Sequence, residues 1–259
     1  IRSQGWNAFQ ILDYCAGIGL DLVHFSDLDS FDNIEAGYLA EVKAHADELG
    51  LAIEVGMMSI CPTATIFDPT QGTAVEQATR MLHVASALGS PILRCVLGSN
   101  ADRRRCAAAD ELPLEAHMQA TIETCQAVRG LAMDLGIKLA LENHAGDMLG
   151  WELKSLIERA GPEYVGACID SGNPVWVGED PMVTLEHLAP YVATSHVRDS
   201  AVAPHPRGAG WAWARAPLQA CWSARCSLRA APGRESQRNV PSCSSHDLLI
   251  LPYVERAKS

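Results

Sequence analysis

Three short polar clusters in the second half of the chain contain the residue types that hold metal ions and move protons. Each cluster directly follows a short apolar run, and the gap from one cluster to the next is about one strand–helix unit. The clusters are Glu142-Asn143-His144, Asp170-Ser-Gly-Asn173 and His196-Val-Arg198-Asp199. A Glu, an Asp and a His brought together make a mixed oxygen and nitrogen site. Such ligands suit Mn²⁺, Mg²⁺, Co²⁺ or Zn²⁺ and leave open positions for a substrate.

These clusters need a scaffold that brings three strand ends together, and the sequence from residue 21 to residue 200 repeats one unit. A short apolar run is followed by a turn, a helical pattern, and then Gly or Pro. In one such unit Leu39, Val42, Ala46 and Leu49 mark one face of a helix that stops at Gly50. Strands are expected at six apolar runs, over residues 21–27, 51–57, 91–97, 138–144, 165–170 and 191–196.

The expected strands are continuous apolar runs rather than alternations of apolar and polar residues. That pattern is typical of parallel strands that are buried on both faces. Strand–helix–strand repetition with short connections predicts right-handed parallel crossovers. The predicted fold class is therefore α/β, a (β/α)₈ TIM barrel, in which strand ends converge at the rim where active sites form. Two more strands are needed: one is expected before residue 11, mostly outside this sequence, and strand 8 is expected after residue 200.

Residues 203–247 differ in composition from the rest of the chain. They are rich in Ala, Arg, Ser, Pro, Trp and Cys, and their only acidic residues are Glu235 and Asp247. Few aliphatic side chains mean too little buried surface to offset the entropy of ordering the segment. We divide the chain into a barrel over 1–202, this atypical segment over 203–247 and a C-terminal tail over 248–259. Either 203–247 is a disordered or interaction segment, or the reading frame shifts near Val202 and returns near Leu248, the hypothesis we favour.

The bulk composition argues against several classes of protein. The chain has 259 residues, within the range of one α/β barrel domain, and a net charge of −11. The acidic charge argues against a nucleic-acid partner, and no apolar run approaches the ~20 residues needed to span a membrane. The nine cysteines are odd in number and include no C-x-x-C pair. That pattern favours a reducing cytoplasm over a disulfide framework or a thiolate zinc site.

The three clusters resemble the signatures of strands 5, 6 and 7 in the xylose isomerase-like barrels. The resemblance spans roughly residues 11–200 and is carried by Leu141-Glu-Asn-His144, Ile169-Asp-Ser-Gly-Asn173 and Ser195-His-Val-Arg-Asp199. It implies that Glu142, Asp170 and His196 are metal ligands and that Glu142 doubles as the catalytic acid/base. The family has a fourth ligand, a Glu at the end of strand 8. No Glu in a strand-like context follows His196 here.

The function that the resemblance implies is a divalent-metal-dependent isomerase or epimerase of a sugar or sugar derivative. In this chemistry a metal acidifies the C–H beside a carbonyl, a carboxylate removes the proton, and an enediolate intermediate is reprotonated. A metal-dependent dehydratase of the inosose or 3-dehydroshikimate type is the alternative on the same fold. An endonuclease IV-like DNA repair enzyme ranks lower, because that family has a histidine where Asn173 stands. An inactive remnant is a further alternative.

Five more polar residues are candidate substrate contacts, namely His144, Asn173, Arg198, Glu54 and Arg94. His144 and Asn173 follow strand ends and could contact substrate or orient a ligand. Arg198 could bind a substrate oxygen or phosphate, or pair with Asp199. Glu54 and Arg94 are expected at the ends of their strands, as substrate contacts or as a mutual ion pair. The expected partner is a small-molecule sugar or polyol-derived substrate, and a homo-oligomer is a possible assembly.

Overall fold

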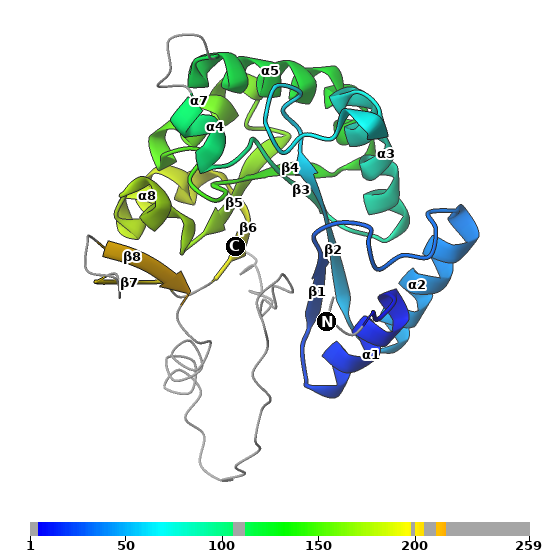
Figure 1. Ribbon diagram of the computed structural model, residues 1–259. Helices are drawn as coiled ribbons and strands as arrows, with labels where there is room; N and C mark the ends of the chain where they lie inside the picture. The colour runs from blue at the N-terminus through cyan, green and yellow to red at the C-terminus, as the bar shows by residue number, and fades with distance from the viewer. Residues whose placement is uncertain (1–4, 106–111, 198–199, 205–210, 216–259) are drawn as a thin grey trace. The chain divides into compact units, whose positions relative to one another are not determined.

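The structure, a computed structural model, describes residues 5–105, 112–197, 200–204 and 211–215 (Figure 1). The described residues fall into two compact units, one that ends at Val197 and one that follows it. Most of the atypical segment 203–247 and the whole tail 248–259 lie outside the described residues. No helix in the described part of the chain is long and apolar enough to cross a membrane.

The first unit is built on one six-stranded sheet whose strands pair in chain order. Every neighbouring pair is parallel, which confirms the predicted strand–helix–strand crossovers. The strands are β1 (Leu22–Phe25), β2 (Ala52–Ser59), β3 (Ile92–Val96), β4 (Lys138–Glu142), β5 (Val165–Asp170) and β6 (Val192–His196). They form a half-barrel, so the predicted TIM barrel class is confirmed.

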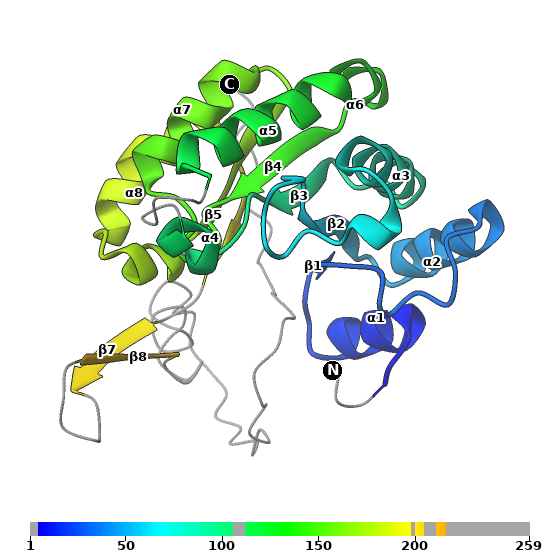
Figure 2. The ribbon, with the colours of Figure 1, turned by 45° about the horizontal axis from the view of Figure 1, so that its top comes forward.

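Helices cover the outer side of the curved sheet (Figure 1, Figure 2). They are α1 (Ala8–Gly17), α2 (Ala36–Glu48), α3 (Ala74–Ala87), α4 (Asn100–Arg105), α5 (Leu114–Ala127), α6 (Arg129–Leu135), α7 (Gly150–Ala160) and α8 (Pro181–Leu188). Short 3₁₀ turns in the described connections are Pro69–Gln71, Asn173–Val177 and Ala189–Tyr191. The chain leaves α2 through Gly50 and α6 through Gly136, whose φ angles of 71° and 67° lie in the left-handed region that glycine adopts without strain.

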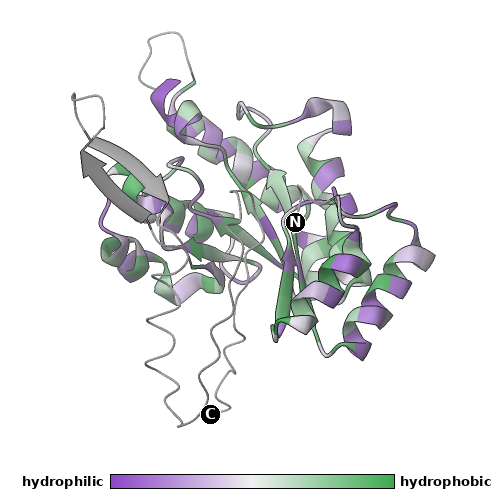
Figure 3. Ribbon diagram, turned by 60° about the horizontal axis from the view of Figure 1, so that its bottom comes forward, coloured by the Kyte–Doolittle hydropathy of each residue, from purple (hydrophilic) through white to green (hydrophobic). Residues whose placement is uncertain are grey.

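Successive residues along each strand point to opposite faces of the sheet, and the two faces differ in chemistry. On the outer face, Val55, Leu93 and Leu141 belong to one continuous apolar core between strands and helices. The helices show alternating hydrophilic and hydrophobic surfaces in Figure 3, as expected for elements that pack one side against that core. The inner face instead carries buried polar residues, namely His24, Glu54, Arg94, Glu142, Asp170 and His196. The outer face thus holds the fold together, and the inner face carries the groups that could do chemistry.

The two further barrel strands are not among the described residues. Residues 5–21 contain α1 rather than a strand, and no strand of the described chain pairs with β1 on its other side. The second unit contains an antiparallel pair, β7 (Ser200–Pro204) with β8 (Trp211–Arg215), which belongs to a separate sheet. The expected strand 8 therefore has no parallel counterpart in the part of the chain that the structure describes.

Candidate metal and active site

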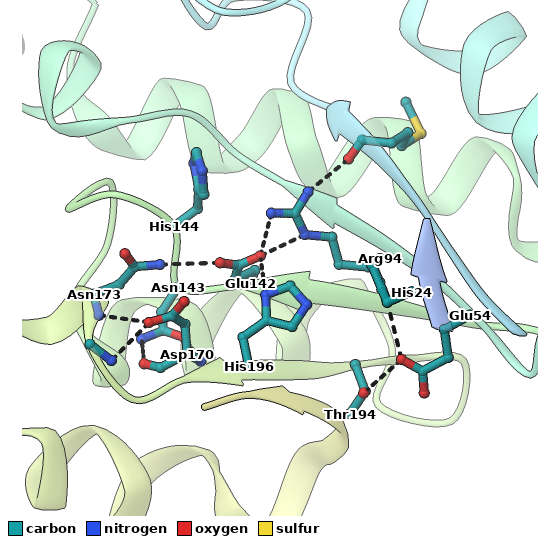
Figure 4. A network of polar contacts seen from close by, with 12 residues as sticks. His24, Glu54, Arg94, Glu142, Asn143, His144, Asp170, Asn173, Thr194 and His196 are labelled. Atoms are coloured by element: carbon teal, nitrogen blue, oxygen red, sulfur yellow. Dashed lines mark hydrogen bonds and ion pairs between the residues drawn. The ribbon is translucent and has the colours of Figure 1, made fainter. Parts of the chain in front are cut away.

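The three predicted metal ligands each occupy the last residue of a strand. Glu142 ends β4, Asp170 ends β5 and His196 ends β6. All three are buried on the inner face of the half-barrel, and their side chains lie close together in Figure 4. Asp170 lies opposite His196 in the β5–β6 ladder, whereas Glu142 lies opposite Cys168 in the β4–β5 ladder. The parallel ladders thus bring strand ends that are far apart in sequence to one rim.

Glu142 and His196 are in direct contact. His196 Nδ1 lies 3.2 Å from Glu142 Oε2, and both side chains are 1% exposed. Neither ring nitrogen of His196 has a hydrogen-bond partner in the described part of the chain. Buried polar groups are nearly always hydrogen-bonded, and leaving one unsatisfied costs about 1–3 kcal/mol. An imidazole held in this way beside a carboxylate fits the requirements of a metal ligand.

Arg94 and Asn173 fix the Glu142 carboxylate from two sides. The Arg94 guanidinium donates to Oε2 from Nε at 2.5 Å and lies 2.5 Å from it through a second nitrogen, while Asn173 Nδ2 donates to Oε1 at 3.1 Å. Burial by itself raises the pKa of Glu142, but the charges of Arg94 and His196 hold it well below its usual value. The carboxyl is therefore ionised at neutral pH and needs to lose no proton before it binds a cation.

The carboxylate of Asp170 caps the turn that follows β5. Its Oδ1 accepts hydrogen bonds from the backbone N–H groups of Gly172 and Asn173, both at 2.8 Å. The side chain of Asn143 bonds both backbone groups of Asp170, accepting from its N–H at 2.8 Å and donating to its carbonyl at 2.9 Å. Asn143, to which the sequence analysis gave no separate role, therefore ties the end of β5 to the end of β4.

A different residue completes the tightest group of ligand atoms. One atom each from Glu142, Cys168 and His196 lie within 4.8 Å of one another, and Asp170 is not a member of that group. Cys168 is fully buried, and burial raises the pKa of its thiol well above the usual value. The sequence analysis missed Cys168, although its position two residues before Asp170 in a strand places both side chains on the same face. Oxygen, nitrogen and sulfur donors together fit a divalent cation.

Glu54 and Arg94 do not end their strands and, among the described ion pairs, do not pair with each other, so these two expectations were wrong, whereas their role as substrate contacts stays a prediction. Each is the third residue of its strand, and among the described ion pairs Arg94 contacts Glu142 while Glu54 contacts His24. Glu54 Oε2 lies 3.3 Å from His24 Nδ1 and accepts from Thr194 Oγ1 at 2.9 Å. Both side chains still reach the interior because side-chain direction, not nearness to the strand end, decides which face a residue occupies.

His24 is a site residue to which sequence reasoning assigned nothing. It is fully buried, and its ring lies against that of His196. Burial is the main cause that lowers the pKa of His24, to about 4, despite the opposing hydrogen bond to Glu54. The available signal was a histidine inside the otherwise apolar strand Leu22-Val23-His24-Phe25, since a polar side chain in a buried strand needs a partner.

His144 lies beyond the end of β4 with its proton position fixed. Its Nδ1 is 2.8 Å from the carbonyl oxygen of Gly98, and a carbonyl only accepts, so Nδ1 carries the proton. Asp147 accepts from the backbone N–H groups of both Gly98 and His144, at 3.1 and 3.0 Å. The loops after β3 and β4 are thereby joined under the rim. Arg198, the remaining predicted site residue, lies outside the described residues.

The fold is an α/β barrel whose inner face carries a group of residues that could hold a metal ion, and the family can now be named. A family model described as xylose isomerase-like TIM barrel matches residues 12–221, so the chain belongs to that family. Among solved structures, a xylose isomerase-like TIM barrel protein from Mycobacterium smegmatis in complex with magnesium is 19% identical, with a TM-score of 0.60 over 82% of this chain and 72% of that chain.

Two epimerases show the same level of likeness. The 3-keto-D-glucoside 4-epimerase of E. coli is 15% identical, with a TM-score of 0.59 over 74% of each chain. The D-psicose 3-epimerase of Clostridium cellulolyticum H10 is 14% identical, with a TM-score of 0.58 over 74% of this chain and 67% of that chain. At these identities the likeness shows a shared fold.

Proposed function

We propose that this chain is a divalent-metal-dependent isomerase or epimerase of a sugar or sugar derivative. The observation that carries the proposal is the contact, at the ends of β4 and β6, between the ionised Glu142 and the His196 ring, whose nitrogens make no hydrogen bond in the described part of the chain. Sugar epimerases among proteins of the same fold support it. Glu142, Asp170 and His196 would hold the cation, which when bound polarises a substrate carbonyl and acidifies the neighbouring C–H.

In this proposal Glu142 is both a ligand and the group that takes the substrate proton. Its low pKa makes it a weak base, so the reaction depends on an acidified C–H. Arg94 and Asn173 hold both of its oxygens, which limits its motion to small shifts between cation and substrate carbon. Reprotonation of the enediolate at the other carbon gives an isomer, and reprotonation on the other face gives an epimer.

The remaining predicted residues bind or orient the substrate in this proposal. His144, held by the contact of its Nδ1 with the Gly98 carbonyl, is proposed as a contact for a sugar hydroxyl. Asn173 shares its amide between Glu142 and the substrate. Arg198 is proposed as a contact for a substrate oxygen. Arg94 and Glu54 act through the residues that they contact. The Arg94 guanidinium contacts Glu142, and the Glu54 carboxylate contacts His24 and Thr194.

The test is incubation of the purified, metal-loaded chain with a panel of ketoses and ketose derivatives in D₂O. The expected result is epimerised or isomerised sugar that carries solvent deuterium at the carbon beside the carbonyl. Glu142→Gln should lower kcat by about 10²–10⁴-fold, the usual contribution of a positioned acid/base group. Glu123→Gln, at an exposed site on α5, is the matched control and should leave the rate unchanged. A product that has lost water would replace the epimerase with the dehydratase, and unchanged turnover in Glu142→Gln would refute the assigned role.

A further inference from the structure

We propose that Cys168 is a ligand of the metal centre, which therefore takes a thiophilic divalent cation, Zn²⁺ or Co²⁺, in preference to Mg²⁺. The inference rests on the proposed function in one respect: the cation is the one held by Glu142 and His196. It adds a sulfur donor that the sequence motifs do not contain and narrows the identity of the metal.

The sheet register places Cys168 between the two groups it would join. Cys168 is paired with Glu142 on β4 and with Thr194 on β6, two residues before His196. Its side chain points to the inner face, where it packs against Ile92 and Ala140. One ligand atom from each of Cys168, Glu142 and His196 fits within 4.8 Å of the others, a separation that small side-chain movements convert into common coordination.

Cys168 differs from the other buried cysteines in lying beside potential metal ligands. The described residues include five free cysteines, all buried. Cys15, Cys61, Cys95 and Cys125 belong to the apolar core between strands and helices, where a thiol serves as a small apolar side chain. Cys168 alone among the five belongs to a group of potential ligands. The second observation is the His196 ring, which is buried in that group and, among the described residues, has no hydrogen bond to either nitrogen atom.

A buried thiolate at Cys168 needs a positive charge beside it, because burial and the carboxylates of Glu142, Asp170 and Glu54 disfavour it and only Arg94 favours it. A divalent cation held by Glu142 and His196 would supply that charge. Buried charges are tolerated when they are paired in this way. The thiol proton passes to solvent as the sulfur–metal bond forms. Thiolate ligands select Zn²⁺ and similar soft cations, whereas Mg²⁺ prefers oxygen ligands in octahedral geometry.

Cobalt spectroscopy on the full chain tests the inference directly. Titration of the metal-free protein with Co²⁺ should produce the visible bands of bound cobalt together with a near-ultraviolet thiolate-to-cobalt charge-transfer band. Cys168→Ala should lose the charge-transfer band and should weaken Zn²⁺ binding by more than the roughly 10–100-fold that loss of an outer-sphere partner costs. Its Mg²⁺ affinity should stay the same. Cys95→Ala, a fully buried cysteine on β3 that faces the helices, is the matched control and should keep the band and the Zn²⁺ affinity.

The possible failures are distinguishable from one another. Visible cobalt bands without a charge-transfer band would show a metal site that Cys168 does not join, which overturns this inference and leaves the proposed function standing. Absence of any cobalt band would overturn both. Unchanged Zn²⁺ affinity in a Cys168→Ala protein with native circular dichroism would also overturn the inference. The spectrum of the unmodified chain decides the question alone if that variant fails to fold.

Discussion

The imidazole rings of His24 and His196 meet edge to face inside the half-barrel, with ring centroids 5.1 Å apart and planes inclined at 87°. His24 comes from β1 and His196 from β6, which are the two edge strands of the six-stranded sheet. A hydrogen bond from Thr194 on β6 to Glu54 on β2, the strand next to the other edge, also crosses the interior. The sheet is therefore curved enough for side chains from its opposite edges to touch, as in a barrel.

Burial of His24 should make the metal-free protein sensitive to acid in a defined pH range. The pKa of His24 is about 4 in the folded chain against 6.5 in the unfolded chain. Because the folded pKa is depressed, the folded chain has its full stability above pH 6.5 and loses about 3 kcal/mol of it as the pH falls to 4. Unfolding in urea at a series of pH values, with a chelator present, measures this loss of unfolding free energy.

The control for this prediction is a histidine outside the barrel interior. His24→Gln should flatten the pH dependence of the unfolding free energy between pH 6.5 and 4, whereas His83→Gln, at an exposed position on α3, should leave it as in the parent chain. An equally steep dependence in His24→Gln would show that another group is responsible.

Removing Arg94 should destabilise the fold through Glu142. Arg94→Met leaves the buried Glu142 carboxylate without its cation, which typically costs 3–5 kcal/mol. The double variant Arg94→Met with Glu142→Gln should recover a large part of that loss, because the unpaired charge is gone. Denaturant unfolding of the parent, both single variants and the double variant gives the coupling energy. Additive effects of the two substitutions would contradict the pairing.

A methyl group at Gly56 should disturb the inner face. A Cβ there would lie 3.0 Å from His24 Nε2, 3.2 Å from the Ser26 carbonyl oxygen and 3.3 Å from Arg94 Cδ. Overpacking of this kind costs about 1–3 kcal/mol, so Gly56→Ala should lower the melting temperature. Gly37→Ala in α2, where no heavy atom lies within 4 Å of the added Cβ, should leave it unchanged or raise it. Equal melting temperatures for the two variants would contradict this account.

Metal binding at the proposed site should stabilise the folded chain. A ligand that binds only the folded state adds about 2.7 kcal/mol when its free concentration is one hundred times its dissociation constant. Zn²⁺ should therefore raise the melting temperature of the parent chain, and His196→Ala should abolish most of the rise. His83→Ala is the matched control, since His83 is exposed on α3. A full Zn²⁺-induced rise in His196→Ala would place the cation elsewhere.

The parallel half-barrel could be predicted from the sequence because its signals are local. Buried strands appear as apolar runs, and glycines such as Gly50 and Gly136 mark helix ends. The bounds of β5, Val165–Asp170, agree with the expected run at both ends, and β6 begins one residue later than expected. Each of these features depends on a few neighbouring residues, which the sequence displays directly.

The candidate site could be predicted only at the strand ends. Glu142, Asp170 and His196 stand out because each is a polar residue that closes an apolar run. Deeper residues lack that signal: His24 and Cys168 lie within strands, and their partners depend on how far the sheet curves and how its strands are staggered. The mutual ion pair expected for Arg94 and Glu54 was wrong for the same reason. Local sequence patterns do not show which side chains meet across the interior.

Asn143 has a consequence for how the two acidic strand ends are held. Its amide occupies both backbone groups of Asp170, beyond the point where the β4–β5 ladder stops at Glu142 and Cys168. The Asn143 amide, with one donor and one acceptor on the same small group, thus ties the end of β5 to the residue that follows Glu142. A residue without that paired donor and acceptor would leave both acidic residues in the sequence but would release the tie between the strand ends that carry them.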